Sequence, residues 1–88
     1  MTAPATQQEA IQQFIDLANS MRTDSFSKES VSTALMRACA VYSSYVVTGN
    51  TGALRPSGVE KIKTLFGDEL LAMQRQKAAN AGVSYDER

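Results

Sequence analysis

The apolar stretch over residues 31–47, VSTALMRACAVYSSYVV, constrains the fold of this chain more than any other part of it. On a helix that turns by about 100° per residue, its apolar side chains fill an unbroken arc of about 160°. We call this set the main arc: Val31, Ala34, Leu35, Ala38, Cys39, Val41, Tyr42, Tyr45 and Val46. A helix with one neighbour needs a narrower apolar face. We therefore expect this helix to be central, with other helices packed on both flanks.

A first helix is predicted over residues 7–21. Thr6 and Glu9 have the spacing of a capping box, in which the Thr6 hydroxyl accepts from the Glu9 amide and the Glu9 carboxylate accepts from the Thr6 amide. Apolar residues then recur three and four positions apart, as on one helix face: Ile11, Phe14, Ile15, Ala18 and Met21. The next segment is polar and serine-rich, which favours a turn. Phe26 is its one large apolar residue, and we expect it to anchor the turn in the core.

The central helix is predicted over residues 28–47, because several turn-forming residues follow it: Gly49, Asn50, Gly52, Pro56 and Gly58. Ser57 and Glu60 repeat the capping-box spacing, which predicts a third helix over residues 58–81. Its apolar stripe is only about 80° wide, enough for one neighbour, and consists of Val59, Ile62, Phe66, Leu70 and Met73. Asn80 and Gly82 mark its end, since glycine readily adopts the left-handed cap conformation.

These elements predict an all-α protein, a small three-helix assembly around the central helix. At 88 residues the chain suffices for one domain over 1–88, in which residues 1–5 and 83–88 are expected to be flexible. A core of this size is only marginally sufficient for stability. Association with a second chain is a common remedy, so a homo-oligomer is possible.

Charge and composition argue against several classes of partner. Nine basic and nine acidic side chains give a net charge of zero, and no helix gathers the basic residues, so we expect no nucleic acid partner. We expect no membrane partner either, because Arg37, Ser43 and Ser44 interrupt the longest apolar runs well short of the roughly 20 residues that a span needs. The start MTAPATQQEA lacks the apolar region of a secretory signal, which predicts a cytoplasmic protein. The single cysteine, Cys39, is expected to be a small core residue.

The sequence offers little for catalysis. It has no histidine and one cysteine, so one chain assembles neither a Cys/His zinc site nor a Ser–His–Asp triad. The Gly49-Asn50-Thr51-Gly52 loop lacks the Gly-Lys-Ser/Thr ending of a phosphate-binding loop. The carboxylates are interpreted as solvated helix surface, although a catalytic pair remains an alternative if a cleft gathers them: Asp16, Glu60, Asp68 and Glu69. We expect no enzyme, no catalytic or metal-binding residue and no cofactor.

The positive signal is surplus apolar surface. Met36, Ala40, Ser43 and Val47 lie on the side of the central helix away from its main arc, where charged residues are expected. We call these four residues the interface face, and Leu71 on the third helix is similarly placed off its stripe. Small and adaptable side chains of this kind suit a closely packed second helix from another chain. The alternative is ordinary surface variation, with the turn before the central helix covering Met36.

Three short motifs carry a resemblance to a known family. They are Phe14-Ile15-Asp16-Leu17-Ala18-Asn19, Val31-Ser32-x-Ala34-Leu35-Met36 and Tyr42-x-x-Tyr45-Val46. Over residues 14–47 the chain resembles the domain of unknown function 3144 family of small bacterial proteins. The resemblance implies a cytoplasmic helical protein. That family has no assigned activity, so the resemblance implies no chemistry.

Three functions from different classes follow from these observations. The first is a non-enzymatic protein–protein interaction module or small accessory subunit, which associates with itself or with another protein through the interface face. The second is a small inhibitor or adaptor, encoded by a host or a phage, that docks on a larger complex through charged residues. The third is an enzyme that uses carboxylates.

Overall fold

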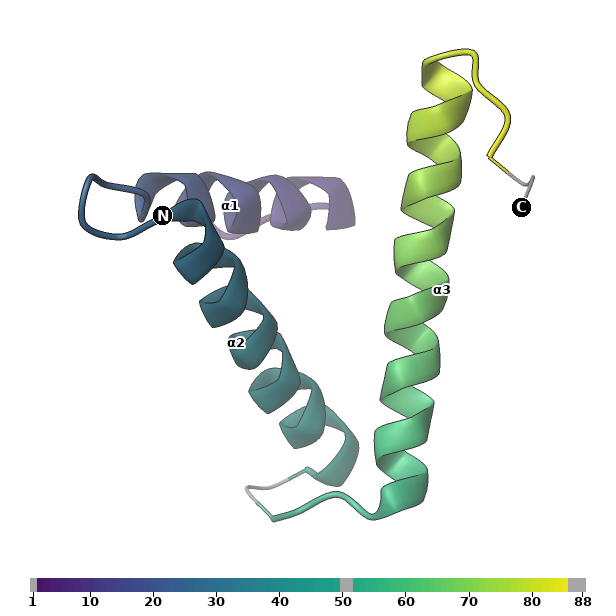
Figure 1. Ribbon diagram of the computed structural model, residues 1–88. Helices are drawn as coiled ribbons and strands as arrows, with labels where there is room; N and C mark the ends of the chain where they lie inside the picture. The colour runs from purple at the N-terminus through teal and green to yellow at the C-terminus, as the bar shows by residue number, and fades with distance from the viewer. Residues whose placement is uncertain (1, 50–51, 86–88) are drawn as a thin grey trace. The chain divides into compact units, whose positions relative to one another are not determined.

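The computed structural model describes residues 2–49 and 52–85, and within these residues it contains three α-helices and no strand (Figure 1). The helices are α1 (Gln7–Ser20), α2 (Lys28–Thr48) and α3 (Pro56–Asn80). The predicted all-α, three-helix fold is therefore confirmed, with ends that differ by at most two residues from the predicted ones. The chain divides into two compact units, Met1–Tyr42 and Ser43–Arg88, and α2 runs from the first into the second.

The start of α1 is held by local hydrogen bonds. The Thr6 hydroxyl accepts from the Glu9 amide at 3.1 Å, as the capping box predicts. The Glu9 carboxylate accepts from the amide of Ala5 at 2.7 Å, so the prediction that it bonds the Thr6 amide is wrong by one residue. The Gln13 side chain also donates to the carbonyl of Thr2 at 2.7 Å. Residues 2–5, expected to be flexible, thus run back along α1, while residues 1 and 86–88 lie outside the described part.

The turn between α1 and α2 is organised by Thr23. Its amide donates to the carbonyl of Phe26 at 3.0 Å, and the Phe26 amide donates to the Thr23 carbonyl and hydroxyl. The amide of Ser25 donates to the same hydroxyl, a local bond pattern that threonine offers readily. Phe26 itself is 42% exposed, so its predicted role as a core anchor is wrong. The turn is closed by backbone and hydroxyl bonds instead.

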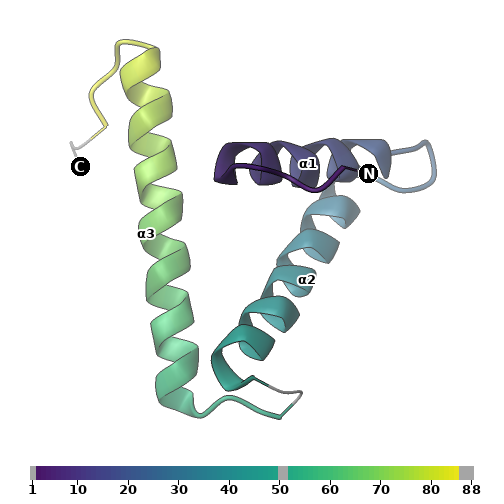
Figure 2. The same cartoon turned by 180° about the vertical axis from the view of Figure 1, so that it is seen from behind.

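The first unit has a very small core. In Figures 1 and 2, α1 lies across the first turns of α2. Val31, in that part of α2, is 6% exposed and is the one buried hydrophobic residue among the described residues. Further along α2, Val41 is 71% and Tyr42 72% exposed. Cys39 is also exposed, so its predicted place in the core is wrong: it lies about two turns beyond Val31 along the same helix.

The connection from α2 to α3 corrects a second prediction. Gly49 ends α2 with a left-handed φ of 75°, and its amide donates to the Tyr45 carbonyl at 2.7 Å. Asn50, part of the predicted stop signal, lies outside the described residues. The third helix begins at Pro56 and not near residue 58, with Arg55 as N-cap and no side-chain cap bond. Proline suits the first helical position because its φ is already helical and its missing amide hydrogen is not needed there.

The start at Pro56 places Ser57 and Glu60 inside the helix, so the second predicted capping box does not form. Glu60 instead pairs with Lys63 at 3.1 Å, one turn further along. Exposed pairs of this kind contribute little to stability. Packing of both neighbouring helices on α2 stays a prediction from the sequence.

The end of α3 has the predicted glycine cap. Gly82 adopts a φ of 73°. Its amide donates to the Ala79 carbonyl at 3.1 Å, and the amide of Val83 donates to the Ala78 carbonyl at 2.9 Å. This pair of bonds is the Schellman arrangement, which satisfies two carbonyls that the helix leaves without an internal donor.

Removal of the Thr6 cap tests the start of α1. We expect Thr6→Ala to lower the free energy of unfolding by about 1 kcal/mol, because the Glu9 amide loses its acceptor. Thr6→Ser keeps the hydroxyl and is expected to stay close to the parent protein. Chemical denaturation followed by circular dichroism measures both. Equal losses in the two variants would contradict the assigned bond.

Two glycines of the α3 region give opposite expectations. Gly82→Ala forces a side chain into a left-handed conformation and is expected to destabilise the protein by about 1 kcal/mol. Gly67 lies within α3, and apart from the adjacent backbone of its own helix nothing lies within 4 Å of the position that an alanine Cβ would take there, so Gly67→Ala is expected to stabilise the helix by up to about 1 kcal/mol. Thermal unfolding of the two single variants distinguishes them. A shift of the same sign in both would contradict this account.

Candidate protein interface

The interface face is a surface feature of one helix. Because α2 is a continuous helix from Lys28 to Thr48, residues four, three and four positions apart line one side of it, as Met36, Ala40, Ser43 and Val47 do. Met36 is 56% and Val47 51% exposed, Ala40 is exposed and Ser43 is half-buried. From residue 38 to residue 48 the helix contains no charged side chain. The face is therefore uncharged and mostly accessible.

Leu71 is the fifth residue predicted for the interface. It lies on α3 and is 39% exposed. Helix register places the other four residues on one face of α2. It gives no position for Leu71 relative to them, because Leu71 lies on a different helix. Leu71 stays a separate prediction.

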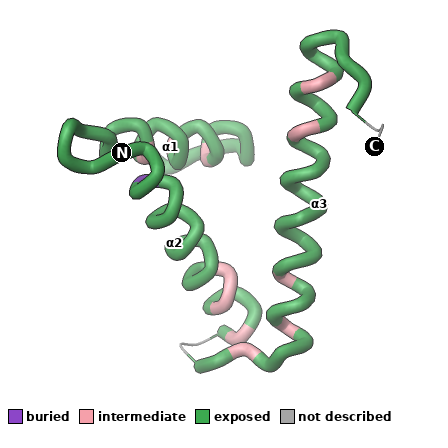
Figure 3. The backbone as a smooth tube through the Cα atoms, in the orientation of Figure 1, coloured by how far each residue is buried: buried purple, intermediate pink, exposed green. Residues whose placement is uncertain are grey.

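The main arc adds to the apolar surface of α2. Together with the interface face it occupies about 260° of the helix circumference from Val31 onward, and Ser32 and Ser43 are the polar residues within it. The remaining side carries Thr33, Arg37, Ser44 and Thr48. A helix that is apolar nearly all round is normally buried. Figure 3 shows most of α2 as exposed, so its composition and its exposure disagree.

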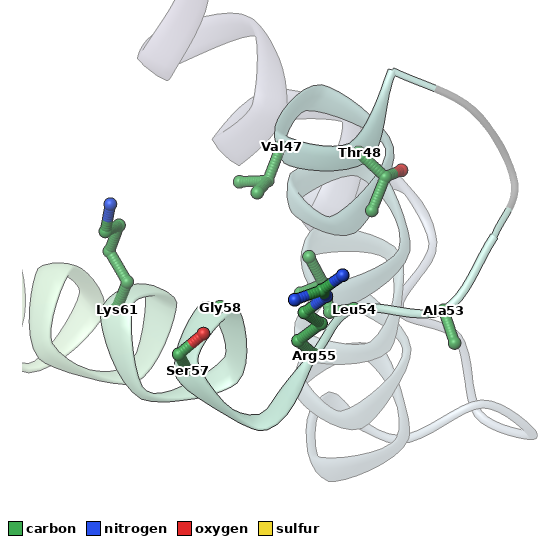
Figure 4. Close-up of a pocket in the computed structure, with 8 residues that line it drawn as sticks. All are labelled: Val47, Thr48, Ala53, Leu54, Arg55, Ser57, Gly58 and Lys61. Atoms are coloured by element: carbon green, nitrogen blue, oxygen red, sulfur yellow. The ribbon is translucent and has the colours of Figure 1, made fainter.

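A hollow of about 710 Å³ lies where α2 ends and α3 begins (Figure 4). Val47 and Thr48 line it from α2, Leu54 and Arg55 line it from the connection, and α3 contributes further residues that include Ser57, Gly58 and Lys61. Leu54 passes close to Gly58, where an added Cβ would come within 3.1 Å of the leucine side chain. The hollow therefore combines apolar side chains with two cations. Val47 belongs both to the hollow and to the interface face.

The hollow was not predicted, although Pro56-Ser57-Gly58 carries a signal for it. The residue before a proline favours an extended conformation, which Arg55 adopts, and a glycine two residues after the proline leaves room for a side chain from the preceding segment. Ser57 and Lys61 lie one turn apart there, but Lys61 is exposed. Figure 4 shows its ammonium group well away from the Ser57 hydroxyl, so the pair is not arranged for nucleophilic catalysis.

The candidate carboxylates have ordinary surface environments. Asp16 accepts a hydrogen bond from the Gln12 side chain at 2.8 Å, and Glu60 pairs with Lys63. Asp68 and Glu69 are exposed on α3. Within residues 2–49 and 52–85 there is no group of three or more His, Cys, Asp or Glu side chains placed to hold a metal ion. None of the described helices combines the length and the apolar character that crossing a membrane requires.

The fold and the exposed face define the class of this protein: a small all-α protein of three helices with a large accessible apolar helix. The family model described as "Protein of unknown function (DUF3144)" matches residues 7–65, and the chain belongs to that family. The match extends beyond the motifs at 14–47 to include the whole of α1 and the first turns of α3. The interface face and the hollow lie inside the matched range, whereas Leu71 lies outside it. No significant match was found among curated proteins or among solved structures.

Proposed function

We propose that this protein is a non-enzymatic protein–protein interaction module, or small accessory subunit, that uses α2 to bind another polypeptide. The carrying observation is the exposure of large apolar side chains on the uncharged part of α2, where Val41 and Tyr42 are more than two-thirds exposed. Val46, Val47 and Met36 on the same helix are more than half exposed. We propose the cytoplasm as its location, since a chain with a single cysteine forms no intrachain disulfide and suits a reducing compartment.

The energetics support this role. Full burial of one large aliphatic side chain is worth about 1.5–3 kcal/mol. Among the described hydrophobic residues only Val31 is buried and the large exposed ones are 39–72% exposed, so a large part of this potential free energy is not realised by the chain alone. When a partner covers several residues of α2, the complex gains this free energy of burial. Folding and binding of this protein are then coupled, because the partner supplies much of the apolar contact that stabilises the helix.

The surroundings of the polar groups favour binding over catalysis. Asp16 and Glu60 interact with neighbours on their own helices, one turn away. The described residues that line the hollow supply two cationic side chains and two hydroxyls, and none of them is a carboxylate. General acid–base catalysis needs an acid and a base within reach of the same substrate atoms. An interaction surface needs only exposed apolar area and room for a partner, and α2 offers both.

Dilution tests this proposal. We expect that the purified chain, diluted until light scattering gives the 9.5 kDa mass of one chain, binds the apolar dye anilinonaphthalene sulfonate and unfolds with low cooperativity. The double variant Val41→Lys, Val46→Lys should bind much less dye, because both substitutions place charge on exposed apolar positions of α2. Gln12→Lys with Thr64→Lys adds the same charge at exposed polar positions of α1 and α3 and should leave dye binding unchanged.

A monomer that binds no dye and unfolds cooperatively at a midpoint independent of concentration would overturn the proposal. Dye binding that the control variant reduces as strongly as the α2 variant would also count against it. If a partner is purified, an affinity that falls steeply with salt would favour the inhibitor or adaptor alternative, because docking through charged residues is screened by ions.

A further inference from the structure

We infer that the partner of the interface face is a second copy of this chain, with the two α2 helices packed antiparallel across a two-fold axis. This inference rests on the proposed function and specifies its partner. The exposure of the face does not by itself identify the partner, but the order of side-chain sizes along the face is symmetric. The order is large, small, small, large: Met36, Ala40, Ser43 and Val47.

The symmetry has a geometric consequence. Met36 and Val47 are equally far from the midpoint between residues 41 and 42, and so are Ala40 and Ser43. In an antiparallel pair related by a two-fold axis at that midpoint, Met36 of each chain therefore meets Val47 of the other chain. Ala40 meets Ser43 in the same way. The two small residues lie where the helix axes cross, which permits close approach, and the larger side chains fill the space on either side.

Charge supports a second copy as the occupant. In a two-fold interface the same surface patch of both chains meets. Charged residues on that patch therefore lie near like charges of the other chain, and the two copies tend to repel each other. The interface face has no charge, and neither does any residue from 38 to 48. Arg37 lies about 100° from Met36 around the helix, outside the face. An antiparallel arrangement also pairs opposite ends of the two helix dipoles, whereas a parallel one places like ends together.

The length of the interface face suits a helix pair. From Met36 to Val47 the face is about 16 Å long at 1.5 Å per residue, which is three turns of helix. The apolar stripe of α3 is only wide enough for one neighbour, and the main arc and interface face of α2 together provide surface for more. A second α2 supplies a neighbour of matching length and character.

Cysteine cross-linking tests the pairing directly. In a Cys39→Ser background, the Met36→Cys variant is mixed with a mass-tagged Val47→Cys variant and oxidised at about 100 µM. The mixture should give a disulfide-linked species of both chains. Each variant alone should cross-link at least about tenfold less, because like residues are then about 16 Å apart, whereas disulfides join Cα atoms about 4.4–6.8 Å apart.

Arg37→Cys mixed with Val47→Cys is the matched control and should not cross-link efficiently. Stronger linkage of Met36→Cys with itself would overturn the antiparallel arrangement.

Light scattering of the unmodified chain tests the second copy itself. We expect twice the monomer mass at high concentration, and we expect Met36→Lys to raise the dissociation constant at least about 30-fold. Gln12→Lys, which adds the same charge on α1, should leave the dissociation constant unchanged. Circular dichroism of a concentrated Met36→Lys sample shows whether its helices persist. This measurement separates loss of the dimer from loss of the fold.

The outcomes for the two proposals are distinguishable. A chain that remains monomeric up to about 500 µM and binds the apolar dye overturns the second copy as partner and leaves the proposed interaction function standing. A monomer that binds no dye overturns both. A dimer that Met36→Lys leaves intact overturns the interface face as the contact surface and keeps self-association.

Discussion

Much of the apolar surface of α2 is exposed, and the other properties of this protein follow from how little of that surface its own chain buries. The main arc and the interface face span about 260° of the helix circumference with only Ser32 and Ser43 as polar residues, yet Val31 is the one buried hydrophobic residue among those described. Water around exposed apolar side chains makes such a helix unfavourable in isolation. The free energy that α2 does not gain inside the chain would be available for binding, which is the basis of the proposed interaction function.

Local interactions determine where the helices begin and end but contribute little to overall stability. The Thr6 cap, the Thr23 turn and the Gly82 cap each use hydrogen bonds between residues that are at most five positions apart. Bonds of this kind contribute roughly 1 kcal/mol each. Helices shorter than about 15 residues are marginal in water without tertiary contacts, and α1 has 14 residues. The persistence of α1 therefore depends on apolar contacts with the rest of the molecule.

The candidate interface illustrates which part of a site can be predicted from sequence. Helix register alone placed Met36, Ala40, Ser43 and Val47 on one face, because the positions of side chains around a helix depend only on its periodicity. The hollow beside Val47 was not predicted, since it depends on the path of the chain before Pro56 and on the contact between Leu54 and Gly58. Cys39 was misplaced because an apolar arc shows which residues favour burial and not which residues have a neighbour to bury them.

The sequence by itself determined the three helices, the Thr6 and Gly82 caps and the periodic faces, because these depend on interactions between residues close together in the chain. Only the tertiary structure decided that Val31 is buried while Phe26, Val41 and Tyr42 are exposed. The start of α3 at Pro56, by contrast, follows from the local preference of proline for the first helical position. Burial depends on which distant residues come into contact, and the 14-residue α1 crosses only the first turns of α2. The remaining apolar surface of α2 is the basis of the proposed interaction.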